Sequence, residues 1–174
     1  MPLVIERPAR NGGSSVPPIP KELAERRKKE PSLVALVPLP ANSRRVTILL
    51  APADVGTYSA YVIDDDPSKL PTGKLRVHNL SPHPIAMQFN GGQRKEMKPR
   101  ETFLVNAPEG HTIYQLAYRS SDEWKVQENN IIPVRPDEQT QLIVLKSTNQ
   151  FFLSSDGASG GYLQMCTLRR KATP

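Results

Sequence analysis

The pattern G-x-S-x-G at Gly157–Gly161 is the part of this chain that could serve nucleophilic catalysis. In a nucleophile elbow the serine lies on a strained turn between a strand and a helix, and an acid and then a histidine follow it. Here the next residues, YLQMCTL, have the composition of a strand, and no histidine follows Ser159. The pattern therefore predicts a flexible Gly/Ser loop, and we expect a protein that is not an enzyme.

One cysteine and three histidines are the candidate ligands for a transition metal. Cys166 has no histidine beyond it, as a copper site would need, and its place in a predicted strand is typical of a small buried hydrophobe. His78, His83 and His111 could bind zinc if they converged, which is possible but which their positions in the sequence do not predict. His78 falls on the polar side of a predicted strand. We expect scattered surface histidines and no cofactor.

The densest group of carboxylates is formed by Asp64, Asp65 and Asp66. Oxygen ligands of this kind suit Ca²⁺, although the residue spacing of a calcium loop is absent. Consecutive acids after a strand are more typical of a solvated turn that also protects a sheet edge. Trp124 lies among charged neighbours, which makes it the best candidate for an exposed aromatic residue. It could anchor a sugar or a peptide, or it could equally cap the core.

Short runs rich in β-branched and aromatic residues position these groups, with turn residues between them at intervals of about 8–12 residues. This spacing predicts an all-β protein, an antiparallel β-sandwich. The predicted strands are Leu33–Val37, Arg45–Leu50, Tyr58–Ile63, Lys74–Leu80, Ile85–Phe89, Thr102–Asn106, Thr112–Arg119, Ile131–Val134, Gln141–Lys146 and Tyr162–Leu168.

Alternation of apolar and polar residues indicates that these strands have one buried face, because successive side chains point to opposite sides. Ile85, Met87 and Phe89 share one face of their strand. The dipeptide Asn90–Gly91 that follows predicts a hairpin turn with positive φ, and Pro108–Gly110 predicts a second turn.

The net charge of +6 lies at the two ends of the chain. Residues 1–30 hold seven Lys/Arg and four Glu, and Arg169, Arg170 and Lys171 add three positive charges, while the residues between them cancel. We predict a flexible, Pro-rich basic leader at 1–32, a sandwich domain at 33–168 and a basic tail at 169–174. Lys21–Lys29 is expected to form a short solvated helix with nothing to pack against. No basic patch in the body predicts specific nucleic-acid binding.

No apolar run approaches the roughly 18 residues of a membrane span, so no transmembrane segment is expected. The first residues, MPLVIERPARNGG, lack the apolar stretch of a signal peptide. A protein that begins at Met1 is expected in the cytoplasm. If a signal peptide once preceded this chain, the expected location is periplasmic or extracellular.

The segments GKLRVHNLSPHPIAMQFNGG and MKPRETFLVNAPEG, followed by HTIYQLAYR, resemble small immunoglobulin-like β-sandwich domains of unknown function in bacterial envelope proteins. In those domains a strand ending in a Ser-Pro turn precedes a short strand, an Asn-Gly hairpin, a Pro-led turn and a strand pair. The resemblance lies within Gly73–Lys146. It implies an immunoglobulin-like fold, an extracytoplasmic location and a binding or structural role.

Three functions remain open at this point. The first is a non-enzymatic structural or protein-binding module of the bacterial envelope, with strand edges and the Gly-rich loop as contact surfaces for an unidentified protein. The alternative is a carbohydrate- or calcium-dependent binding domain that uses Trp124 and Asp64–Asp66. The third is weak polyanion or nucleic-acid binding through the basic tails. The oligomeric state stays open.

Overall fold

Ten strands and one short helix make up the part of the chain that the computed structural model describes, which is residues 21–52, 56–107, 110–120, 122–147 and 162–171. The predicted all-β class is confirmed. The elements are α1 (Lys21–Lys29), β1 (Val46–Pro52), β2 (Tyr58–Asp64), β3 (Lys74–Asn79), β4 (Ile85–Phe89), β5 (Gln93–Met97), β6 (Thr102–Val105), β7 (Gly110–Ser120), β8 (Glu123–Val134), β9 (Glu138–Lys146) and β10 (Leu163–Lys171).

The described residues fall into two compact units. The first contains the residues up to Pro38 and those from Ile48 to Val62, and the second contains Leu39–Thr47 and everything from Ile63 onward. Ser32, where the sequence places the boundary between leader and sandwich, lies inside the first unit.

The first unit combines α1 with most of the two-stranded sheet β1-β2. Leu23 of the helix is completely buried, so the expectation of a helix with nothing to pack against is wrong. Leu23 is the buried residue of a helix whose other side chains are mostly charged. The predicted strand Leu33–Val37 is also absent, although its Val34 carbonyl accepts a hydrogen bond of 2.8 Å from the Tyr58 amide.

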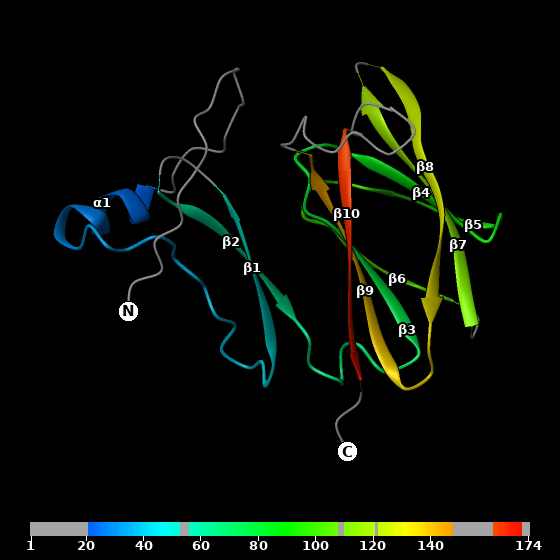
Figure 1. Ribbon diagram of the computed structural model, residues 1–174, viewed down its shortest axis with the longest axis horizontal. Helices are drawn as coiled ribbons and strands as arrows, with labels where there is room; N and C mark the ends of the chain where they lie inside the picture. Colours follow the sequence, from blue (N-terminus) through cyan, green and yellow to red (C-terminus); the bar gives the residue numbers. More distant parts are fainter. Residues whose placement is uncertain (1–20, 53–55, 108–109, 121, 148–161, 172–174) are drawn as a thin grey trace, which may run out of the picture. The chain divides into compact units, whose positions relative to one another are not determined.

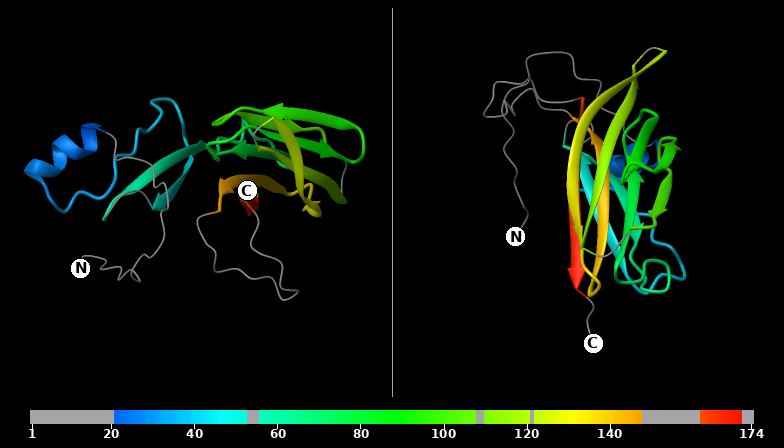
Figure 2. Two further views of the ribbon diagram at one scale, coloured as in Figure 1. Left: turned by 90° about the horizontal axis from the view of Figure 1, so that it is seen from above. Right: turned by 90° about the vertical axis from the view of Figure 1, so that its right-hand side faces the viewer.

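The second unit is a sandwich of two four-stranded sheets, with strand orders β10-β9-β3-β6 and β5-β4-β7-β8. Both can be followed by colour in Figures 1 and 2, where β9 is orange and β10 red. All pairs are antiparallel except β3 and β9, which are parallel, so the prediction of a purely antiparallel sandwich is wrong at this pair. The strands between β3 and β9 in sequence include the whole second sheet, and such a crossover lets the chain enter β9 in the direction of β3.

The core lies between these two sheets and follows the predicted alternation. Ile85, Met87 and Phe89 of β4 are buried on one face, as predicted. The buried members of the core are Leu75, Val77, Ile85, Met87, Phe89, Met97, Val105, Tyr114, Leu116, Ile132, Val134, Leu142, Val144 and Leu163. Removing this apolar surface from water is the main stabilising term of the sandwich.

The hairpin β4–β5 turns at Asn90 and Gly91, whose φ angles of 48° and 70° confirm the predicted turn with positive φ. Asn90 also accepts a 2.9 Å hydrogen bond from the Ile113 amide through its side chain. The strand after the turn, β5, was not predicted, because its sequence QRKEM is charged. Pairing with β4 through the hairpin outweighs this low strand propensity. The predicted turn at Pro108–Gly110 lies partly outside the described residues.

A β-bulge in β8 joins the two sheets along one side of the sandwich. Leu116 pairs with Glu128 and Ala117 with Val126, which leaves Gln127 as the extra residue of the bulge. The Gln127 amide donates to the Leu163 carbonyl and its oxygen accepts from the Leu163 amide, both at 2.7 Å. A side chain thus takes the place of a neighbouring strand at the start of β10.

The variant Gln127→Ala removes both hydrogen bonds to Leu163. We expect the free energy of unfolding to fall by about 1–2 kcal/mol, the usual contribution of a pair of partly buried hydrogen bonds. Urea denaturation followed by circular dichroism measures the change. The matched control is Gln115→Ala, an exposed strand glutamine of β7. Equal loss in the two variants would contradict the proposed joining role of Gln127.

Candidate functional site

A buried carboxylate, Asp65, lies over the face of sheet β10-β9-β3-β6 that points away from the core. Only 2% of its surface is exposed. One carboxylate oxygen accepts a hydrogen bond from the Thr47 hydroxyl and the other accepts one from the Gln141 amide. The charge of Asp65 is therefore solvated by protein donors instead of water, as a buried ion requires.

The Gln141 side chain connects Asp65 to His78 of the neighbouring strand β3 through a second hydrogen bond. The Gln141 oxygen and His78 Nε2 are 2.8 Å apart. Burial lowers the pKa of His78 to about 4, against an opposing effect of the Gln141 hydrogen bond, and the positive charge of Arg76 lowers it further. His78 is thus neutral at pH 7 and donates its Nε2 proton to Gln141.

Arg45 connects the backbone of Asp65 to Gln139 of β9. Its guanidinium donates to the Asp65 carbonyl at 3.0 and 3.2 Å and to the Gln139 oxygen at 2.7 Å. Gln139 in turn donates to the Leu70 carbonyl. We call Arg45, Thr47, Asp65, His78, Gln139 and Gln141 the Asp65 network. Every polar side chain in it has a hydrogen-bond partner, which makes it a rigid polar layer on one face of the sheet.

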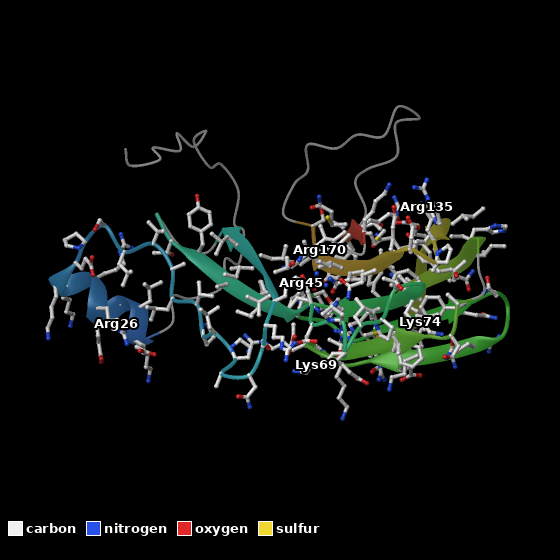
Figure 3. The ribbon with its side chains drawn as sticks, turned by 90° about the horizontal axis from the view of Figure 1, so that it is seen from below. Arg26, Arg45, Lys69, Lys74, Arg135 and Arg170 are labelled. Atoms are coloured by element: carbon white, nitrogen blue, oxygen red, sulfur yellow. The ribbon has the colours of Figure 1, made fainter. Side chains whose placement is uncertain are left out.

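A hollow of about 290 Å³ opens between the Asp65 network and strand β10. Thr47, Asp65, Gln139 and Gln141 line one side, and Thr167–Arg170 line the other. Arg170 pairs with Gln139 across the ladder, and Arg45 binds the same glutamine, so both arginines, labelled in Figure 3, lie by this end of β9. The hollow therefore adjoins the outer strand of the sheet.

Strand β10 is an edge strand, with β9 as its one neighbour among the described strands. The Tyr162 carbonyl accepts from the Ser147 amide, whereas both backbone groups of Leu163 turn to Gln127. Because these directions alternate along an antiparallel ladder, the backbone groups of Met165, Thr167 and Arg169 point away from β9. Thr167 and Arg169 are exposed. These groups form an open row of donors and acceptors.

The other three edges of the sandwich are shorter or better protected. β6 has four residues and β5 has five, with Arg94, Lys95 and Glu96 in the middle of β5. β8 carries the bulge at Gln127, and Pro133 has no N–H to offer a new neighbour. Charges, bulges and prolines are the usual means of protecting an edge. β10 has neither bulge nor proline, and the charges of Arg169, Arg170 and Lys171 are its only protection, so it is the most accessible long edge.

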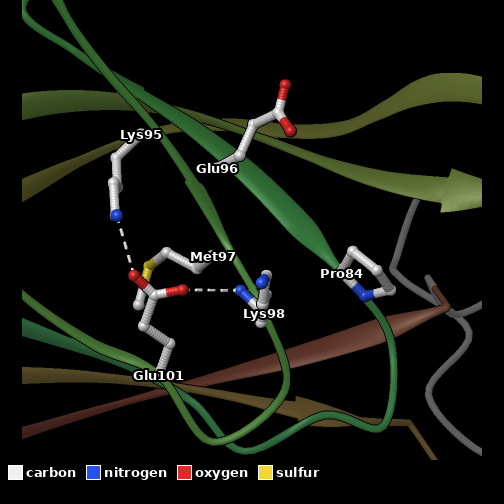
Figure 4. Close-up of a pocket in the computed structure, with 6 residues that line it drawn as sticks. All are labelled: Pro84, Lys95, Glu96, Met97, Lys98 and Glu101. Carbon is white, nitrogen blue, oxygen red and sulfur yellow. Dashed lines mark hydrogen bonds and ion pairs between the residues drawn. The ribbon is translucent and has the colours of Figure 1, made fainter.

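A second hollow, of about 490 Å³, lies beside β5 and is drawn in Figure 4. Its central carboxylate, Glu101, pairs with Lys95 at 2.7 Å and accepts from the Lys98 amide at 2.9 Å. The Lys95 hydrogen bond, followed by the one from Lys98, lowers the pKa of Glu101. The Glu101 carboxylate and the Lys95 ammonium of this hollow are thus paired with each other.

The predicted acidic cluster does not converge on one point. Asp64 accepts from Lys69 and Ser43, whose hydrogen bonds lower its pKa to about 2, and Asp66 accepts from the Ser68 amide at 2.9 Å. Asp65 is buried, so the expectation of a wholly solvated turn is wrong. The turn fails to be solvated because Thr47 and Gln141 enclose its middle residue. In the described part of the chain no three His, Cys, Asp or Glu residues form a possible metal site.

The expected surface location of His78 and buried location of Cys166 are both wrong. His78 is 3% exposed, and its ring can be buried because the Gln141 side chain hydrogen-bonds to it. Cys166 is exposed because β10 is an edge strand. His83 binds the Tyr162 hydroxyl at 2.6 Å, and Tyr162 stacks on Tyr118 with ring centroids 4.6 Å apart.

Trp124 is exposed, as its charged neighbours led us to expect, and lies outside the linings of both hollows. The G-x-S-x-G pattern lies outside the described residues. β10 runs to Lys171, so Arg169, Arg170 and Lys171 belong to a strand and not to a tail. The sequence reasoning missed Gln139 and Gln141, whose signal was a polar half-strand, EQTQ, running directly into the apolar LIV.

Comparison with family models, with curated proteins and with solved structures found no match for this chain. Within the described ranges, the helix is too short and too polar to cross a membrane.

The buried, neutral state of His78 predicts a stability that declines with acidification. Its folded pKa of about 4 is below the ordinary value of 6.5, so the unfolded chain takes up the proton first as the pH falls. Between pH 7 and pH 5 this costs about 1–2 kcal/mol of unfolding free energy. The variant His78→Gln should lose that part of the pH dependence, measured by urea denaturation at both pH values.

The control for this measurement is His111→Gln, at an exposed position. Asp64 stays ionised over the whole range, because its pKa is about 2. An unchanged pH dependence in His78→Gln would show that His78 is not held neutral in the folded protein.

Proposed function

We propose that this chain is a non-enzymatic protein-binding module in which β10 receives an extended segment of another protein as an additional strand. The observation that supports this most directly is the open backbone edge of β10, with exposed Thr167 and Arg169 and no protecting bulge or proline. In strand addition, main-chain hydrogen bonds supply affinity and pockets beside the edge select side chains. The hollow lined by Thr167–Arg170 is suited to that second role.

The sandwich is suited to this role mechanically. β10 is held by β9 along its whole length, from Leu163–Lys146 to Lys171–Glu138, and by Gln127 at its first residue. The Asp65 network fixes the layer beneath the hollow. A receiving strand that is already in position loses little conformational freedom when its partner binds, and this favours affinity.

The proposal includes the immunoglobulin-like character of the sandwich and a place in the bacterial envelope. Both rest on the resemblance of Gly73–Lys146 to envelope domains. Fold analogy alone does not define a function, so the argument for binding depends on the β10 edge.

The calcium-dependent alternative is less favoured, because the carboxylates of Asp64, Asp65 and Asp66 already accept hydrogen bonds from different protein groups. For the carbohydrate alternative, Trp124 is exposed but lines neither hollow. The polyanion alternative assumed a basic C-terminal tail, but Arg169–Lys171 are part of β10. Removing them would shorten a strand.

Proline at position 167 tests strand addition. Thr167→Pro removes an outward N–H from an edge strand without removing a hydrogen bond to β9, so the fold should be kept. We expect peptides selected from a random phage-displayed library on the original protein to bind the variant at least about tenfold more weakly, a difference of about 1.4 kcal/mol. Fluorescence anisotropy of the labelled peptides measures the affinities.

The matched control is Thr167→Val, which keeps the N–H and suits a strand. Amide hydrogen exchange checks that β9 stays protected in both variants. Peptides that bind Thr167→Pro as well as Thr167→Val, or a library that yields no binder, would overturn the proposal.

A further inference from the structure

Three consecutive cations, Arg169, Arg170 and Lys171, form the end of β10. Arg169 pairs with Thr140, Arg170 with Gln139 and Lys171 with Glu138 across the ladder. Successive side chains of a strand point to opposite faces, so Arg170 is on the face of the hollow while Arg169 and Lys171 are on the other. All three are exposed. Among the described residues none of them forms an ion pair.

This arrangement restricts what can pair with the edge. A second copy of the chain that paired through the same half of β10 would bring Arg169 and Arg170 of one copy against the cations of the other. Like charges at opposite or diagonal positions of neighbouring strands are destabilising. A basic partner segment meets the same repulsion. The edge is therefore open to strands of complementary charge.

We infer that the segment received by β10 is acidic, with Asp or Glu at the positions that face Arg169, Arg170 and Lys171. This inference rests on the strand-addition function proposed above and specifies its partner. Carboxylates on both faces of the added strand would each meet an exposed cation without competing for an existing ion pair.

The hollow adds a constraint on the register. Leu168 and Arg170 both line it, and so does the Asp65 carboxylate. A negative side chain inserted there would lie close to a buried negative charge. The partner residue that faces Leu168 meets no cation there and is therefore uncharged, whereas a carboxylate that faces Arg170 is compensated by the exposed guanidinium of that residue.

The test uses the full chain and two labelled probe peptides of the same β-forming sequence, one with three Glu and the other with three Lys at the charged positions. Anisotropy titrations at about 0.15 M salt, where exposed charges are screened beyond about 8 Å, give the two affinities. We expect the Glu peptide to bind at least about tenfold more tightly than the Lys peptide. Equal affinities, or tighter binding of the Lys peptide, would overturn the inference.

Charge reversal locates the preference. The double variant with Arg169→Glu and Arg170→Glu should bind the Lys peptide more tightly than the Glu peptide. The control, Lys28→Glu with Lys29→Glu, makes the same change in net charge on exposed positions of α1. A preference that persists in the β10 variant, or one that reverses in the α1 variant, would contradict a site on β10.

Two further results separate this inference from the proposed function. If the original protein binds the Glu and Lys peptides with equal affinity and Thr167→Pro abolishes the binding of both, strand addition stands and the acidic preference fails. If a Glu peptide with N-methylated amides, which cannot form the ladder, binds equally well, the attraction is that of any polyanion and strand addition fails. A dimer in sedimentation equilibrium that Thr167→Pro dissociates would show that a second copy is the occupant, against the inference.

Discussion

Strand β9 is buried on both faces, and much of the sandwich follows from that constraint. Its residues from Glu138 to Val144 are all buried, although the first four are polar. Apolar Leu142 and Val144 pack in the core between the sheets. Gln139 and Gln141 point the other way, and because a buried amide needs partners, the outer face requires a covering layer of donors and acceptors. Arg45, Asp65 and His78 form that layer.

The edge of β10 is covered at its first residue and uncovered further along the strand. On the β8 side a bulge places Gln127 against the backbone of Leu163, which joins the sheets and occupies the edge of β10 at its first residue. Further along, β10 has no such cover, and charges are its only protection. Basic residues on an edge are a common defence against aggregation, since identical edges then repel one another. The same charges leave the edge available to a strand of opposite sign.

Local signals in the sequence predicted the parts of the fold that depend on local structure. The alternation of Ile85, Met87 and Phe89 and the dipeptide Asn90–Gly91 determine β4 and its turn from a few neighbouring residues. The candidate site is different in kind. Gln141 and His78 are 63 residues apart in sequence, so no local pattern could indicate that each provides the other's partner in a buried place.

The basic residues after Leu168 show the same limit. A run of three cations near a chain end is typical of a solvated tail. Here the run continues a strand, because Glu138–Thr140 offer it a complete ladder and the edge lets its side chains reach solvent. Pairing with a distant segment therefore determines that these residues form a strand. Burial, which the alternation of apolar and polar residues indicates, does not contribute, because all three side chains are exposed.

The energies involved determine what kind of binding an open basic edge can support. An exposed ion pair contributes about 0.2–1 kcal/mol, so three of them change an affinity by roughly threefold to a hundredfold, and their contribution weakens with salt. The larger share of the binding free energy must come from the backbone ladder and from a partner side chain in the hollow. The edge of β10 and the hollow are both formed before the partner binds. Charge then decides which strand pairs with β10, and the ladder decides how long it stays, because electrostatic complementarity acts mainly on specificity and on the rate of association.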